Sequence, residues 1–299
     1  MIGKATVLSL LVLAACGQGI GGGASVPTPA PPTGEVEAQR QDLATEAEQL
    51  FRERGDRAKL EQAIARWEQA VTLDPSDWHS RAWLARAYQF LGDAYYDGAA
   101  VSERARVFQA GIAHARAGIE ALSPRVRELL ANGVDISDAI DALDHSAAPL
   151  VYWYAADLGS YADAAGRIEG LQQKDRILAL IDWVHERAPD FHFYGADRFL
   201  GSYYAVVPAM FGGDLARSEQ HFRSAIKGDP RYPGNYYLMA RFWAPAAGDE
   251  ALWHDYLGRV ASLEPCAEGG PLPCVVPGWE PEAMLDRRRA GKRVSRGFD

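Results

Sequence analysis

Apolar side chains recur along the chain at spacings of three and four residues. From residue 37 onward Ala, Leu, Glu and Arg dominate, and segments that alternate apolar and polar residues are nearly absent. A spacing of three and four places apolar side chains on one face of an α-helix. The pattern therefore predicts an all-α domain over residues 37–265.

One motif repeats within this helical region. Ala63, Trp67, Ala70 and Pro75 are separated by four, three and five positions. This spacing resembles the second helix of a tetratricopeptide repeat, in which proline ends the helix. The spacing recurs, with larger or looser matches in the last two cases, at residues 218–230, 253–265 and 177–189. The first-helix pattern is matched by Leu84, Ala85 and Tyr88, by Leu200, Gly201 and Tyr204, and by Met239, Ala240 and Trp243.

These matches predict how the helices pack. Small residues let paired helices approach closely, and one pair cannot bury its apolar face alone, so pairs stack on one another. The period is irregular, and residues 123–146 fit no repeat. The predicted fold is an α-α superhelix of degenerate tetratricopeptide-like helix pairs with inserted helices.

The amino-terminal segment predicts export and a lipid anchor. Lys4 precedes a short apolar stretch that ends in Leu13-Ala14-Ala15-Cys16, which resembles a lipoprotein signal peptide over residues 1–15 with Cys16 as the acylated residue. An ordinary cleaved signal with an incidental cysteine is the alternative. Residues 16–36 then form a Gly- and Pro-rich linker. Because Gly17 rather than Asp follows the cysteine, the outer membrane is the expected destination.

Charge and hydropathy exclude two other classes. A formal net charge of −9 argues against nucleic-acid binding, which requires a basic surface. No segment after the leader is apolar enough to span a bilayer. We therefore expect a periplasm-facing protein that is held at the membrane by lipid alone.

The last part of the chain, residues 266–299, is predicted to be an extension of the helical domain. Cys266 and Cys274 lie in a Pro- and Gly-rich loop, and outside a reducing compartment a disulfide between them is expected. A metal-binding pair is the alternative. The basic segment from Arg287 to Arg296 is interpreted as a solvated, disordered end, or else as a contact with acidic lipids or an acidic partner.

Several central segments together resemble the T component of tripartite ATP-independent periplasmic (TRAP) transporters. They are Leu150 to Gly159 (LVYWYAADLG), Tyr194 to Tyr204 (YGADRFLGSYY), Met210 to Asp214 (MFGGD) and Leu238 to Phe242 (LMARF). The resemblance implies a lipid-anchored periplasmic helical protein that assembles as a homotrimer. It also implies association with the periplasmic solute-binding protein of a TRAP system and handover of an organic acid or apolar ligand.

No catalytic constellation is recognisable. His185-Glu186 lacks the second histidine of a zinc-protease motif, and His185, His192 and Asp197 straddle a turn with no spacing that fixes them on one face. Asp214 is expected to cap its helix. The sequence predicts neither an enzyme, a metal site nor a cofactor.

Aromatic residues are the more informative candidates. Packing between helices accounts for many of them, but tyrosine and tryptophan also suit the lining of an apolar cavity. The candidates for such a lining are Tyr152, Trp153, Asp157, Tyr194, Asp197, Tyr203 and Asn235.

Two functions remain open at this point. The first is a ligand-handover module that docks a solute-binding protein, and the second is a general tetratricopeptide scaffold of the cell envelope with no small ligand. An apolar cavity lined by Tyr152, Trp153 and Tyr203 favours the first, whereas a filled interior with an open concave groove favours the second.

Overall fold

A computed structural model describes residues 34–298 of the chain. Within this range the regular structure is helical, and the one β-type pairing is an isolated bridge between Pro265 and Val275. The predicted all-α class is confirmed. The leader, Cys16 and the linker up to residue 33 lie outside the described residues.

The helices follow one another with short connections, except for residues 262–279 between α13 and α14. They are α1 (Gly34–Arg52), α2 (Arg57–Leu73), α3 (Trp78–Tyr95), α4 (Val101–Leu122), α5 (Pro124–Ala131), α6 (Ile136–Ala139), η1 (Ile140–Ala142), η2 (His145–Ala147), α7 (Ala148–Ala165), α8 (Arg167–Arg187), α9 (Phe191–Val206), η3 (Ala209–Phe211), α10 (Leu215–Gly228), α11 (Pro233–Leu238), η4 (Met239–Trp243), α12 (Ala244–Ala247), α13 (Glu250–Ala261) and α14 (Glu280–Val294).

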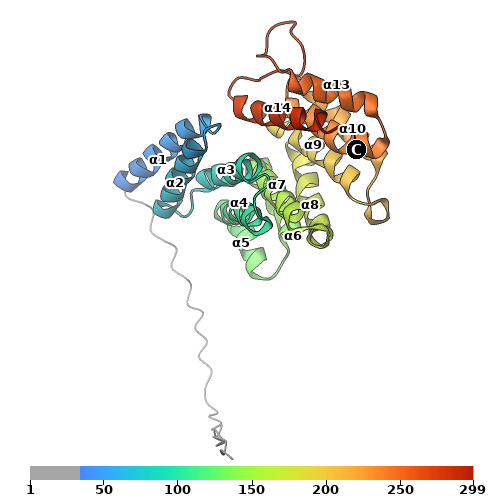
Figure 1. The fold of residues 1–299 in the computed structure, drawn as a ribbon. Helices are drawn as coiled ribbons and strands as arrows, with labels where there is room; N and C mark the ends of the chain where they lie inside the picture. The colour runs from blue at the N-terminus through green and yellow to red at the C-terminus, as the bar shows by residue number, and fades with distance from the viewer. Residues whose placement is uncertain (1–33, 299) are drawn as a thin grey trace, which may run out of the picture. The chain divides into compact units, whose positions relative to one another are not determined.

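Consecutive long helices pack as pairs that stack on their neighbours. α1 packs on α2, α3 on α4, α7 on α8 and α9 on α10, and α7 also contacts α3 and α4. Figure 1 shows α3, α4 and α7 side by side in the teal and green part of the chain. The predicted stacking of helix pairs is therefore present, and no helix in this range is long and apolar enough to cross a membrane.

The repeated spacing buries its residues as expected. Ala63, Trp67 and Ala70 on α2 are completely buried, and the Trp67 ring stacks on Trp83 of α3 with ring centroids 5.5 Å apart. Asp56 begins α2 by accepting hydrogen bonds from two backbone N–H groups of its first turn, an N-cap that satisfies otherwise unpaired donors. The local sequence thus determines both the ends of this helix and its buried face.

The copy of the spacing at residues 218–230 also explains why position 201 is a glycine. Phe222 of α10 is completely buried against Gly201 of α9, where a Cβ atom would come within 2.7 Å of the phenylalanine ring. Ser218 donates a hydrogen bond to the Gly201 carbonyl at 2.6 Å. A small residue at position 201 is therefore required for α9 and α10 to approach this closely.

Residues 123–146, which fit no repeat, form α5, α6 and two 3-10 turns. This segment packs on α4 and α8, and Asp135 pairs with Arg176 of α8. It is an insertion into the stack, as the irregular period predicted.

The carboxyl-terminal part differs from the expectation. The basic segment is not a disordered end, because residues 280–294 form α14, which packs on α11 and α13 (Figure 1). Arg289 of α14 donates a hydrogen bond to the backbone carbonyl of Asp93 at the end of α3. In the structure a disulfide joins Cys266 to Cys274 in the preceding loop. The helical region begins at Gly34, three residues before the predicted start.

Candidate ligand cavity

The amino-terminal end of α9 holds an unusual backbone conformation. His192, Phe193 and Tyr194 have φ angles of 52°, 57° and 59°, which form one left-handed turn. Each such residue costs roughly 1–2 kcal/mol when it is not glycine. Surrounding contacts must therefore maintain the turn, and strain of this kind is concentrated at functional sites.

Arg198 supplies much of that support. Its guanidinium group donates hydrogen bonds to the carbonyls of His192 and Phe193 at 3.3 and 3.2 Å, and to the side-chain oxygen of Asn235 at 2.8 Å. The Phe193 ring stacks on Tyr232 with centroids 4.4 Å apart. Together these contacts hold the left-handed turn against the first turn of α9.

A cavity of about 890 Å³ lies beside this turn. Its walls come from α3, α7, α8, α9, α11 and α14, together with the π-helical turn η4. The aromatic residues that line it are Phe90, Tyr152, Trp153, Phe199, Tyr203, Tyr232 and Phe242, together with the His192 ring. Its size and mainly apolar walls match those of small-molecule binding sites.

Arg198 is one of several cationic residues in the cavity wall. It is buried, and no carboxylate among residues 34–298 lies within ion-pair distance of it. It also donates a hydrogen bond to the Tyr152 hydroxyl at 3.2 Å and lies over the Tyr232 ring, 4.8 Å from its centroid. Hydrogen bonds satisfy four of its five N–H groups, but no carboxylate balances its charge, so an anionic ligand group in the cavity would be attracted to it.

A second charged group closes the cavity where α14 meets α3. Glu282 of α14 pairs with Arg54, and with Arg86 of α3 at 3.5 Å. The Arg86 guanidinium also lies over the Trp279 ring, 4.3 Å from its centroid. Burial lowers the pKa of Arg86 to about 10, so it remains a cation at neutral pH.

Burial shifts the pKa of two titratable groups in the cavity wall toward their uncharged forms. Burial raises the pKa of the Asp286 carboxyl to about 7, against the opposing effect of Arg289 and Arg198. Burial, followed by the nearby arginines, lowers the pKa of His192 well below its usual value. His192 is thus a neutral ring among Trp153 and Trp279, at centroid distances of 4.9 and 5.0 Å.

Three of the seven candidates from the sequence line the cavity, and four do not. Tyr152, Trp153 and Tyr203 are in its wall. The four others, Asp157, Tyr194, Asp197 and Asn235, lie in the same segments but do not line the cavity.

Three of these four residues pack against other parts of the helix stack. Asp157 faces Gly111 of α4, where it is completely buried without a hydrogen bond, and burial raises its pKa well above the usual value. Tyr194 packs against Gly228. Asn235 donates to the carbonyls of Ala225 and Asp229 while it orients Arg198.

The candidate metal residues separate into two groups. His192 lies in the aromatic wall of the cavity, whereas His185 and Asp197 do come together, with His221 of α10 as the third member. The sequence did not indicate His221, because it lies on the next helix with no fixed spacing from the other two.

Comparison with known proteins adds one match. The family model for the TRAP transporter T component matches residues 79–272, which is more than half of the chain. The chain belongs to this T-component family. A search among curated proteins finds no matching relative.

Membership confirms the resemblance drawn from the central segments. It associates this T-component protein with TRAP transporters and so with the cell envelope. The matched region includes α7, α9 and the MFGGD turn, but it ends before Cys274 and α14. The part of the cavity wall that α14 contributes therefore lies outside the matched region.

Several cavity residues of this T-component protein had no clear signal in the sequence. Arg198 stands inside a segment that carried the family resemblance, and it forms with the adjacent Asp197 a pair of charged residues among otherwise uncharged ones, which was a usable sign. Arg86 and Asp286 offered none, because they are far apart in sequence and meet only when α14 packs beside α3.

The MFGGD turn of the T-component protein forms an exposed apolar loop at the edge of the cavity. Gly213 packs against the Val207 carbonyl, where a Cβ atom would come within 1.7 Å of the oxygen, and Asp214 is the N-cap of α10, as predicted. Val206, Val207 and Pro208 line the cavity, while the next residues, Met210 and Phe211, are exposed.

Proposed function

We propose that this protein is a lipid-anchored TRAP accessory component that docks the periplasmic solute-binding protein and transfers an amphipathic organic acid through its cavity. Cys16 carries the lipid in this proposal, and residues 17–33 connect the lipid to the helical region. The alkyl part of the ligand lies against the aromatic wall, and its carboxylate lies at Arg198.

The cavity carries this proposal. An interior of about 890 Å³ with aromatic walls favours an apolar ligand, and the buried Arg198 without a carboxylate partner favours a negative charge on it. Tyr152, Trp153 and Tyr203 all line the cavity, which supports ligand handover over a general scaffold. A scaffold without a ligand would fill this space with side chains.

The exposed loop beside the cavity supports the docking step. Met210 is 82% exposed, and so are, to a smaller extent, Phe211 of the same loop and the residues that flank it, Val206 at the end of α9 and Leu215 at the start of α10. A cluster of exposed apolar side chains next to a ligand cavity is typical of a protein interaction site. A solute-binding protein that docks here would present its ligand directly to the opening.

Decanoate and decanol provide a test of ligand binding. We expect decanoate to bind about 10- to 100-fold more tightly than decanol, because a charge-assisted hydrogen bond to Arg198 contributes about 1.5–3 kcal/mol. Tryptophan fluorescence measures the binding, since Trp153 is in the wall. Ala156→Leu on α7 fills part of the cavity and should weaken both ligands about tenfold or more.

The matched control is Ala65→Leu, which makes the same substitution on the exposed face of α2. It should bind decanoate as the unmodified protein does. Equal binding of decanoate and decanol would contradict a role for Arg198. If neither ligand binds, or if Ala156→Leu binds both as well as the unmodified protein does, the handover proposal is wrong.

A further inference from the structure

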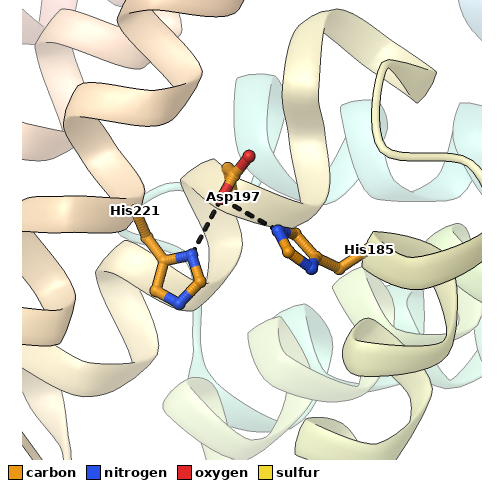
Figure 2. Close-up of side chains that lie close together, drawn as sticks. All are labelled: His185, Asp197 and His221. Atoms are coloured by element: carbon orange, nitrogen blue, oxygen red, sulfur yellow. Dashed lines mark hydrogen bonds and ion pairs between the residues drawn. The ribbon is translucent and has the colours of Figure 1, made fainter.

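A histidine–carboxylate–histidine cluster lies at the junction of three helices. His185 of α8, Asp197 of α9 and His221 of α10 point toward one another (Figure 2), and one nitrogen or oxygen atom from each lies within 4.8 Å of the others. Asp197 Oδ1 is 3.2 Å from His185 Nε2 and 2.8 Å from His221 Nδ1. None of the three residues lines the ligand cavity.

From this geometry we infer a binding site for a divalent transition metal, with Zn²⁺ as the representative ion. Two imidazole nitrogens and one carboxylate oxygen are a common three-residue ligand set for Zn²⁺. Metal–ligand bonds of about 2.0–2.1 Å in a tetrahedron separate neighbouring ligand atoms by about 3.3 Å. The distances from Asp197 Oδ1 are close to that value, so small side-chain movements suffice to admit the ion.

The surroundings of the cluster are compatible with a cation. The Asp197 side chain is 8% exposed and that of His185 37% exposed, so the carboxylate is held in place while one side of the cluster opens to solvent. A water molecule or an external group can occupy the fourth ligand position there. Asp182, half-buried one turn before His185, adds negative charge near both histidines, and Arg217 opposes it.

Packing limits the freedom of two ligands before any ion binds. The His221 ring stacks on Tyr204 of α9, with centroids 5.7 Å apart and planes at 12°. Asp197 is on the first regular turns of the same helix, after the left-handed turn. A bound ion would join α8, α9 and α10 at one point and would therefore stabilise the folded protein.

Zinc titration of the full chain, without a histidine tag and after treatment with a chelator, tests the site. Calorimetry should show one Zn²⁺ per chain with a Kd of about 1 µM or tighter, and Zn²⁺ should raise the Tm. His185→Ala and His221→Ala should each weaken binding by more than the roughly 10- to 100-fold loss seen when only an orienting partner of a ligand is removed.

His254→Ala is the matched control, because His254 Nε2 lies 3.5 Å from Glu250 Oε1 in an exposed pair on α13. It should leave zinc affinity unchanged. His185→Ala keeps the test valid if His221→Ala fails to fold, since His185 is the most exposed ligand. Unchanged affinity in His185→Ala, or only weak binding of several ions per chain, would overturn the assignment.

Discussion

The Asp286 carboxyl group is buried in the cavity wall and accepts no hydrogen bond from residues 34–298. Burial raises its pKa in the folded protein from an ordinary value near 3.8 to about 7. As the pH rises from about 4 to about 7, the unfolded chain therefore releases this proton before the folded protein does. The stability that the protonated group provides is fully present below pH 4 and is lost across this window.

The substitution Asp286→Asn should remove this pH-dependent loss of stability. One pKa unit corresponds to about 1.4 kcal/mol, so the shift has an upper limit of ~4 kcal/mol. We expect the variant to gain stability relative to the unmodified protein at pH 8 and much less at pH 5, as measured by urea unfolding at both values. Asp42→Asn, at an exposed position of α1, is the control and should leave the stability unchanged at both pH values. An equal gain at both pH values would contradict the role of proton release.

At the scale of elements, the pairing of Glu282 with Arg54 and Arg86 connects α14 to the amino-terminal helices. Arg54 Nε donates to Glu282 Oε1 at 2.9 Å, and the Arg54 side chain is 2% exposed. Glu282→Gln leaves two buried cations without a carboxylate, which should destabilise the protein by about 3–5 kcal/mol. Urea unfolding measures the change.

The comparison for this variant is Glu219→Gln, which breaks the exposed pair of Glu219 with Arg223 on α10. An exposed pair contributes about 0.3–0.5 kcal/mol, so this control should be almost neutral. Similar losses in the two variants would show that α14 is not held by the buried charges.

At the scale of the whole molecule, docking of the solute-binding protein is the central prediction. Met210→Glu puts a charge into the exposed apolar loop beside the cavity and should reduce recovery of the solute-binding protein about tenfold, which corresponds to a loss of about 1.4 kcal/mol, as for a residue that contributes strongly to an interface. Co-purification from detergent-solubilised envelopes with tagged protein measures the recovery.

Val294→Glu at the end of α14 makes the same change at another exposed apolar position and should leave recovery unchanged. Absence of the solute-binding protein from the unmodified sample would count against the partner. If both variants recover less of the solute-binding protein, the interaction is not specific to the loop.

Local sequence was sufficient for the helices that follow the repeated spacing. Ala63, Trp67 and Ala70 are buried as predicted, and so are Ser218, Phe222 and Ala225, because small and large residues at helical spacing determine which face can pack. The same reasoning failed for α14. Its many arginines indicate a solvated segment, but Arg289 is stabilised by Asp93, a residue almost two hundred positions earlier.

The sequence by itself determined the helical class, the buried faces of the repeated helices, the family and the aromatic segments from which the cavity is built. These depend on spacing along one or two helices. Only the tertiary structure decided which polar residues meet. It placed Arg198 and Asp286 in one wall and Asp197 beside His185 and His221, because such contacts depend on how separate helices stack, which no spacing along the chain records.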